Sequence, residues 1–267
     1  MDKLGSKAIT MAVIAGMSAV SFFIHKIIKK KRRKRMMLSS VNNLDSTKIS
    51  FDKDEQYLNN IMALKNILGF EDKFPFISEK TIRSILRAFL HLIKERFGKE
   101  LTEFDRVRRG LLNNKSAYSK QYVKERQRLD LLLEQGLSQT LEDLSLSEDK
   151  YSKSLERAFT KSPDFEKEYT NCIVSLHIQG DIEERIKEED LLGILEYKMI
   201  KWKEIELSGF NTENELRVSV KQTYIDDLAF KCFGYENKLL IRNIDQSNSK
   251  EVKDLLEKYN QLVKASD

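Results

Sequence analysis

Apolar and polar positions follow a helical period along most of the chain after residue 52. In residues 79–97 the apolar side chains recur at spacings of three and four: Ile82, Ile85, Leu86, Phe89, Leu90, Ile93 and Phe97. That spacing places them on one face of an α-helix. Ser78, a residue type that caps helices, precedes this run, and Gly98 follows it. We therefore expect a helix that begins after Ser78 and ends at Gly98.

Similar start and stop signals divide the rest of the chain into helices. A longer, more polar helix is expected over residues 115–145, and a last one around residues 252–263. Other predicted helix starts are Asp52 with Glu55, Ser147, Ser162 with Pro163, Asp181 with Glu184, and Thr212 with Glu215. Predicted ends are Gly69, Gly180, Gly209 and Gly234. Only residues 238–244 (KLLIRNI) look strand-like, and they also suit an extended linker. The sequence thus predicts an all-α body, either a helical bundle or a short α-solenoid.

The N-terminal segment has a different pattern. Residues 8–24 carry no charge and are apolar on all sides; they include Ala8, Ile14, Gly16, Val20, Phe22, Phe23 and Ile24. At about 1.5 Å per residue this helix is roughly 25 Å long, and Ile27 and Ile28 extend it to about 30 Å. Such a length spans a thin bilayer. We predict a single transmembrane anchor, and we keep a cleaved signal peptide or mitochondrial presequence as alternatives.

Seven consecutive bases follow the apolar run: Lys29, Lys30, Lys31, Arg32, Arg33, Lys34 and Arg35. Beside an apolar span they are typical of a collar that stops transfer and holds the following chain in the cytosol. The collar can also contact anionic lipid headgroups. Residues 36–51 are rich in Ser and Asn. The predicted organisation is an anchor with its collar (1–35), a linker (36–51) and a soluble helical domain (52–267).

Composition and charge narrow the class of protein. Two prolines and ten glycines in 267 residues favour long helices over a β-sandwich. Two cysteines without CxxC spacing fit a reducing compartment. Residues 1–40 contain ten Lys and Arg against one Asp, a net charge of +9, whereas the other 227 residues contain 37 bases and 41 acids, a net charge of −4. A nucleic-acid-binding body is not expected from this charge distribution.

One stretch resembles a known repeat. Ala158 and Pro163 occupy the small-residue and proline positions that close one tetratricopeptide repeat, and Tyr169 has the place of the next aromatic. Gly180 and Asp181 fall at the turn between its helices. The resemblance covers residues 155–190, with Ile173 and Arg185 departing from the pattern and no second copy 34 residues away. It implies a helical hairpin of the kind that binds peptides.

Motifs for chemistry are absent from the sequence. No phosphate-binding loop, nucleophile elbow or HExxH occurs, and the three histidines have no partner at metal-ligand spacing. We therefore expect no catalytic residues, no metal and no cofactor. Asp181, Glu184, Glu188 and Glu189 form an acidic cluster, interpreted either as the solvated first turn of a helix or as a patch for a protein partner. Arg106, Arg108 and Arg109 are interpreted either as a basic patch that faces lipid or, preferably, as scattered surface charge.

These patterns lead to one principal hypothesis for the function. The chain is expected to be a non-enzymatic, membrane-anchored helical adaptor or receptor, or an accessory subunit of a membrane complex, that binds protein partners. Its anchor and collar resemble those of signal-anchored mitochondrial outer-membrane import receptors. That membrane is favoured, with the endoplasmic reticulum and the mitochondrial inner membrane as alternatives. Other possible functions are a lipid-binding or membrane-tethering domain and a membrane-associated enzyme whose site is dispersed in the sequence.

Overall fold

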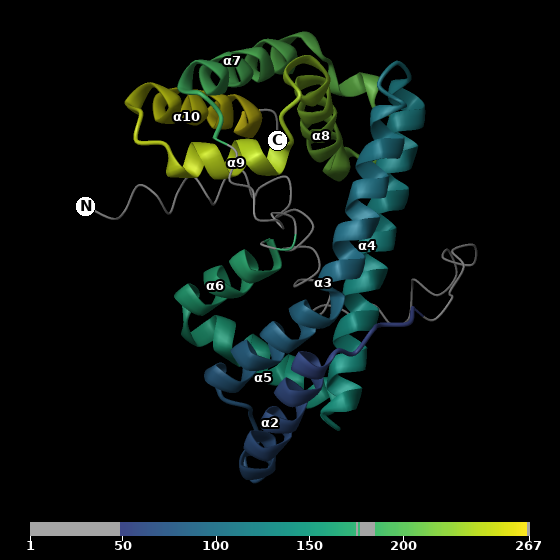
Figure 1. Ribbon diagram of the computed structural model, residues 1–267, viewed down its shortest axis with the longest axis vertical. Helices are drawn as coiled ribbons and strands as arrows, with labels where there is room; N and C mark the ends of the chain where they lie inside the picture. Colours follow the sequence, from purple (N-terminus) through teal and green to yellow (C-terminus); the bar gives the residue numbers. More distant parts are fainter. Residues whose placement is uncertain (1–48, 175, 177–184, 266–267) are drawn as a thin grey trace. The chain divides into compact units, whose positions relative to one another are not determined.

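The computed structural model describes residues 49–174, 176 and 185–265, and every regular element in them is a helix, which confirms the all-α prediction (Figure 1). The bounds are α2 Glu55–Glu71, α3 Glu79–Arg109, α4 Lys115–Asp143, α5 Glu148–Lys161, α6 Pro163–Val174, α7 Glu188–Glu204, the 3-10 turn η2 Leu207–Gly209, α8 Asn214–Phe233, α9 Asn237–Gln246 and α10 Lys250–Lys264. None of these described helices is both long and apolar enough to cross a membrane. The predicted anchor and collar, residues 1–35, lie outside the described residues.

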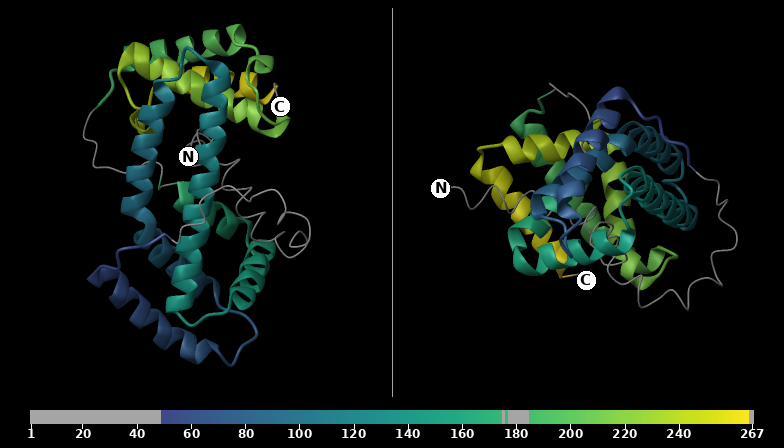
Figure 2. Two further views of the ribbon diagram at one scale, coloured as in Figure 1. Left: turned by 90° about the vertical axis from the view of Figure 1, so that its right-hand side faces the viewer. Right: turned by 90° about the horizontal axis from the view of Figure 1, so that it is seen from below.

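The described residues form two compact units. Unit 1 consists of residues 101–127 and 185–265, and unit 2 of residues 49–100 and 128–176. The long helices α3 and α4 each contribute a segment to both units, and Figure 2 shows these two helices running beside each other. The predicted domain of residues 52–267 therefore contains two separately packed cores.

Unit 2 is built around the apolar stripe of α3 that the sequence analysis identified. Ile82, Ile85, Phe89, Ile93 and Phe97 are all fully buried. They lie in a core with side chains from the other helices of this unit: Tyr57 and Ile61 of α2, Leu133 and Leu137 of α4, Tyr151 and Leu155 of α5, and Phe165 and Tyr169 of α6. Gly136 of α4 allows a close approach to α3, because a Cβ there would lie 2.3 Å from Cγ2 of Ile93.

Unit 1 contains two apolar clusters. The first joins the α3–α4 turn and the start of α4 to α7, α8 and α10; it comprises Leu112, Tyr118, Tyr122, Trp202, Ile205, Phe210, Val220, Tyr224, Ile225, Tyr259 and Val263. The second lies between α7, α8, α9 and α10, and includes Leu195, Ala229, Leu240, Ile244 and Val252. Buried aromatic rings meet edge to face in the first cluster, as do Tyr118 and Tyr224 with centroids 4.9 Å apart. Helices α7, α8 and α10 contribute side chains to both clusters.

Several predicted helix starts are confirmed. The side chain of Ser147 accepts a hydrogen bond from the Lys150 N–H, and α6 begins at Pro163. Ser78 likewise accepts from the Thr81 N–H before α3. For α2 the capping residue is Asp54 and not Asp52, because the Asp54 carboxylate is the one that accepts from Tyr57 N–H. These contacts satisfy backbone donors that a helix leaves unpaired at its N-terminus.

The predicted helix ends were less accurate. Helix α3 continues through Gly98 to Arg109, and α2 continues through Gly69 to Glu71. Only Gly234 among the described glycines adopts the left-handed conformation that a glycine stop signal requires, with φ +80°, and it ends α8 as predicted. Helix α7 begins at Glu188, and α8 at Asn214 after Glu213, so Thr212 is not its cap.

Residues 238–244 are not a strand or a linker. They lie within α9, which buries Leu239, Leu240 and Ile244 on one face. A short apolar run has no period long enough to separate a strand from a buried helix. Packing against α7 and α10 in the second cluster of unit 1 decides in favour of the helix.

Replacing a glycine by alanine is expected to have opposite effects on stability in α2 and in α4. Gly136→Ala should lower the free energy of unfolding by about 1–3 kcal/mol, because the new methyl group would overlap Ile93 in a filled core. Gly69→Ala has open space around it and should raise the free energy of unfolding by up to about 1 kcal/mol through better helix propensity. Urea unfolding of the two variants checks the sign. A Gly136→Ala variant as stable as the wild type would show that α3 and α4 are not in such close contact.

Candidate functional site

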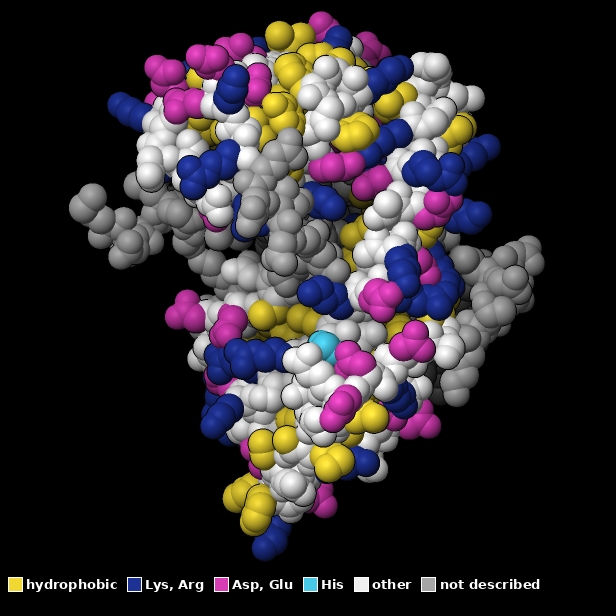
Figure 3. All heavy atoms as spheres, viewed as in Figure 1, with side chains coloured by type: hydrophobic (Ala, Val, Ile, Leu, Met, Phe, Trp, Pro, Cys, Tyr) yellow, Lys and Arg dark blue, Asp and Glu magenta, His cyan; other side chains and the backbone are white. Residues whose placement is uncertain are grey.

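Exposed apolar side chains concentrate on one short segment of unit 2. Six large hydrophobic residues of the described chain are exposed, and five of them lie between residues 58 and 74: Leu58, Met62, Ile67, Phe70 and Phe74. Met62, Phe70 and Phe74 are 64%, 79% and 62% exposed. We call these five residues the α2 surface; Figure 3 shows the apolar side chains that gather over this helix. Exposed apolar groups that gather in one segment mark interaction sites more often than single ones do.

The local sequence explains why α2 exposes this face. Tyr57, Ile61 and Leu64 fill the core, and the hydroxyl of Tyr57 donates to the Asp143 carboxylate of α4 at 2.8 Å. Their spacing of three and four fixes the buried face, so Leu58 and Met62 turn outward. Helix α2 is therefore apolar on two sides, and only one side is covered by the described chain.

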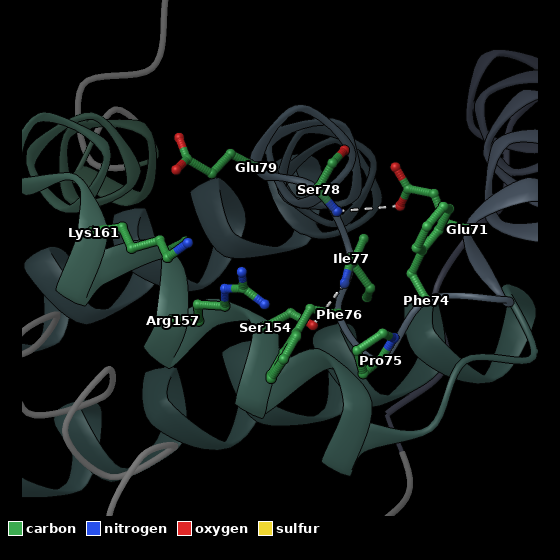
Figure 4. A pocket seen from close by; sticks show the side chains of 11 residues that line it. Glu71, Phe74, Pro75, Phe76, Ile77, Ser78, Glu79, Ser154, Arg157 and Lys161 are labelled. Carbon is green, nitrogen blue, oxygen red and sulfur yellow. Dashed lines mark hydrogen bonds between the residues drawn. The ribbon is translucent and has the colours of Figure 1, made fainter.

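A tight turn after α2 forms a pocket against α5. Pro75 has no N–H to continue the helix, and it restricts Phe74 before it to an extended conformation. Pro75, Phe76 and Ile77 line a cavity of about 440 Å³ together with Ser154, Arg157 and Ala158 of α5, Phe74 at its edge and Lys161 at the end of α5 (Figure 4). We call this cavity the Phe74 pocket. Phe74 belongs to both the pocket and the α2 surface, so the two are continuous.

Hydrogen bonds hold the turn in place. The Ile77 N–H donates to Oγ of Ser154 at 2.9 Å, and the Ser78 N–H donates to Oε2 of Glu71 at 3.2 Å (Figure 4). The hydroxyl of Thr81 donates to the other carboxylate oxygen of Glu71 at 2.9 Å. Both oxygens of Glu71 therefore accept a hydrogen bond from the residues that follow the turn.

Unit 1 contains a second concentration of polar chemistry, a buried ion cluster around Arg108. This arginine is 7% exposed, and its guanidinium donates to Asp227 of α8 at 2.7 Å, to Glu125 of α4 at 2.6 Å and to Asp105 of α3 at 2.6 Å. The hydroxyl of Tyr118 also donates to Asp227 at 2.6 Å. The cluster joins helices α3, α4 and α8.

Arg109 extends this cluster toward α9. Its Nε donates to Asp227 at 3.1 Å, and its two terminal nitrogens donate to the two oxygens of Glu236 at 2.9 and 2.6 Å. The guanidinium also lies 3.5 Å from the ring centre of Phe230. The prediction that Arg108 and Arg109 are scattered surface charge is therefore wrong. Only Arg106 is exposed, and it pairs with Glu103 one turn away.

The pKa shifts in the cluster follow from burial. Burial raises the pKa of the Glu125 and Asp105 carboxyls, and the positive charge of Arg108 offsets part of this effect. Burial also raises the pKa of the Tyr118 phenol well above its usual value, so the phenol keeps the proton that it donates to Asp227. For Arg108, burial opposes the charge, but the neighbouring anionic groups outweigh it and raise the pKa of the guanidinium.

Perturbed pKa values are a signature of active sites, yet this cluster has the features of a structural one. Each charged group in it is paired with another group of the same cluster. The residues that line the Phe74 pocket belong to unit 2, and none of them is a member of the cluster. We therefore assign the cluster to the stability of unit 1 and take the α2 surface with its pocket as the candidate functional site.

The acidic patch predicted from the sequence is only partly described. Glu188 and Glu189 are exposed in the first turn of α7, where acids complement the helix dipole. Asp181 and Glu184 lie outside the described residues, as do the anchor and collar residues and Gly180, on which the tetratricopeptide resemblance depends. The partner patch and the repeat stay predictions.

The other candidate residues for chemistry are dispersed. Nε2 of His91 lies 2.8 Å from the Asp54 carboxylate that caps α2, and His25 and His177 lie outside the described residues. Cys172 lies in unit 2 and Cys232 in unit 1, and neither is part of a disulfide. In the part of the chain that the structure describes, no group of three or more His, Cys, Asp or Glu side chains is placed to hold a metal ion.

Sequence reasoning missed the α2 surface for an identifiable reason. Leu58 follows the buried Tyr57 directly in an apolar stretch, and nothing in that stretch marks it as the one that is 47% exposed. A signal was present, since residues 55–71 carry apolar side chains on more than one helical face. Such a helix either lies in the middle of a core or has a second apolar contact.

The ion cluster predicts a large effect of a small change. Asp227→Asn keeps the shape of the side chain but removes the anion that faces Arg108 and Arg109, so the free energy of unfolding should fall by about 3–5 kcal/mol. Glu103→Gln, at the exposed Arg106 pair on the same α3, is the matched control and should unfold like the wild type. Urea unfolding measures both. Equal midpoints for Asp227→Asn and the wild type would contradict the assignment.

Comparisons of the chain with protein-family models, with curated protein sequences and with solved structures found no match.

Proposed function

We propose that this chain is a non-enzymatic adaptor, anchored in an intracellular membrane by residues 1–35, that binds a protein partner on the α2 surface. The two helical units act as bundle-type scaffolds that hold this surface in the cytosol. The mitochondrial outer membrane is the favoured location, with the endoplasmic reticulum and the mitochondrial inner membrane as alternatives. An accessory subunit of a membrane complex has the same physical requirements and is included in the proposal.

The observation that carries the proposal is the concentration of exposed apolar groups on α2. Met62, Phe70 and Phe74 are the kinds of side chain that are enriched at protein interfaces, where large flexible or aromatic groups fill pockets of a partner. The exposed polar residues among the α2 surface include the uncharged Asn59 and Asn66 and one charged residue, Lys65.

The same surface is less suited to lie on a bilayer. Helices that lie in a membrane interface carry Lys and Arg on their polar face. Residues 55–74 contain three acids and two bases, so the segment has no net attraction to anionic headgroups. In the proposal, membrane attachment comes from the apolar run and the seven bases of residues 8–35, and α2 is left for the partner.

The non-enzymatic part of the proposal is supported by the way the charged groups are used. The carboxyls of Asp105 and Glu125, whose pKa values burial raises, pair with Arg108. Burial also raises the pKa of the Asp226 carboxyl, which pairs with Lys198 at 2.8 Å. A general acid or base has to reach a substrate, whereas these groups are occupied by neighbouring helices.

The anchor has a direct test. The full-length chain should stay in the membrane pellet when membranes are extracted with alkaline carbonate, because an apolar span is not released by removing peripheral contacts. A chain without residues 1–35 should be recovered in the supernatant. Release of the full-length chain would contradict membrane anchoring.

Partner binding is tested by photo-crosslinking from defined positions. A photo-reactive phenylalanine analogue in place of Met62 or Phe70 should give one discrete crosslinked protein in native membranes. The same analogue in place of Ile200, which is 53% exposed on α7, is the matched control and should give none.

Two results would contradict the proposal. Equal crosslinking from position 200 would show that exposure alone, and not the α2 surface, determines contact. Crosslinks from positions 62 and 70 to lipid, without a protein product, would favour the membrane-tethering alternative.

A further inference from the structure

We infer that the Phe74 pocket binds an acidic segment of the protein partner, with an apolar side chain of that segment in the cavity and a carboxylate paired with Arg157 and Lys161. This inference rests on the proposed function, because it takes the partner to be a protein that covers α2. It adds the chemistry that the partner needs to fill the site.

The cavity has room for an apolar side chain of the partner together with the backbone that carries it. Its volume of about 440 Å³ is near the lower end of the range typical of pockets for small molecules. Apolar surface comes from Phe74, Pro75, Phe76, Ile77 and Ala158. A partner residue such as phenylalanine or leucine would bury its side chain here beside Phe74, while the rest of the partner covers α2.

The acids and bases that line the pocket differ in whether they have a partner within the chain. Glu71 uses both oxygens within the chain, and Glu79 lies 3.8 Å from Arg83. Arg157 and Lys161, in contrast, form no ion pair with any residue that the structure describes. The Arg157 guanidinium lies 4.4 Å from the ring centre of Phe76, which holds it at the mouth of the pocket. Figure 4 shows both cationic side chains on the α5 side of the cavity.

The difference between the paired acids and the two bases without an ion pair determines which ligand fits the pocket. A free cationic pair beside an apolar cavity is complementary to an apolar residue that is followed by one or two acids. Arg157 and Lys161 are one helical turn apart on α5, so neighbouring carboxylates of one segment can reach both. An anionic membrane surface is a poorer match. A short segment can contact Arg157 and Lys161 alone, whereas a flat membrane would also face residues 55–74, which carry three acids and two bases and have no net attraction to anionic headgroups.

The test uses a defined probe and the full-length chain in detergent. The probe is the peptide acetyl-Ser-Phe-Glu-Glu-amide with 4-fluorophenylalanine as its aromatic residue, and binding is followed by the broadening of its fluorine NMR signal. The matched probe acetyl-Ser-Phe-Gln-Gln-amide has the same shape without charge. We expect saturable binding of the acidic probe and about tenfold weaker binding of the amide probe, since charge-assisted contacts are lost.

Substitutions in α5 locate the binding. In the double variant Arg157→Gln with Lys161→Gln, the affinity for the acidic probe should fall to that for the amide probe. Lys153→Gln is the control, because Lys153 lies one turn earlier on α5, pairs with Asp149 and does not line the pocket. It should bind the acidic probe like the wild type.

The inference fails if both probes bind equally, if neither binds, or if the double variant and the Lys153→Gln control behave alike. Failure of the inference is separable from failure of the proposed function. If a protein crosslinks from positions 62 and 70 but the acidic probe is not preferred, the proposed adaptor function stands and the acidic segment is ruled out. If the acidic probe is preferred but no protein crosslinks, the pocket selects acidic peptides and the adaptor function is contradicted.

Discussion

The Arg108 guanidinium sets the constraint on which the packing of unit 1 depends. A buried charge is tolerated only when its counter-charges are in place, and here they come from three different helices. Glu125 and Asp227 are themselves almost fully buried, so neither can turn to water if the other helices move. Helices α3, α4 and α8 therefore have to assemble together, and Arg109 brings the start of α9 into the same arrangement through Glu236.

The α2 surface is governed by the opposite condition. In unit 2 the buried contacts of α2 come from Tyr57, Ile61 and Leu64, while Met62 and Phe70 contact water. Unit 2 thus folds with apolar groups uncovered, although each of them would be more stable out of water. Exposed apolar side chains beside a pocket whose lining is held by hydrogen bonds to Ser154 and Glu71 are consistent with a lasting protein contact.

The sequence predicted the fold class and most helix starts, because these depend on local chemistry. Ser147 and Ser78 cap the backbone N–H three residues ahead of them. Helix ends were harder to predict. A glycine stops a helix only in the left-handed conformation, which Gly234 adopts and Gly69 does not. The α9 segment has too few residues for its period to be recognised, and its helix is decided by neighbours far away in the sequence.

The candidate site was less predictable than the fold. Whether Leu58 or Arg108 is buried depends on contacts with residues up to 119 positions away, which the pattern along the chain does not contain. Whether the apolar side chains on a second face of a helix are exposed likewise depends on which other elements pack against that helix. What the sequence did provide was the type of residue: apolar groups beyond one face of α2 and bases on α5, whose roles became visible once Phe74 and Arg157 were placed in the same pocket.

The most direct test of the central claim is hydroxyl-radical footprinting of Met62 and Phe70 in three states: purified chain in detergent, chain in pure lipid vesicles, and chain in native membranes. Ile200 serves as the internal reference for an exposed apolar side chain. A protein partner on the α2 surface predicts that Met62 and Phe70 are oxidised in detergent and in vesicles but protected in native membranes, while Ile200 is oxidised in all three. Equal oxidation of Met62 and Phe70 in all states, or protection by lipid vesicles alone, would contradict it.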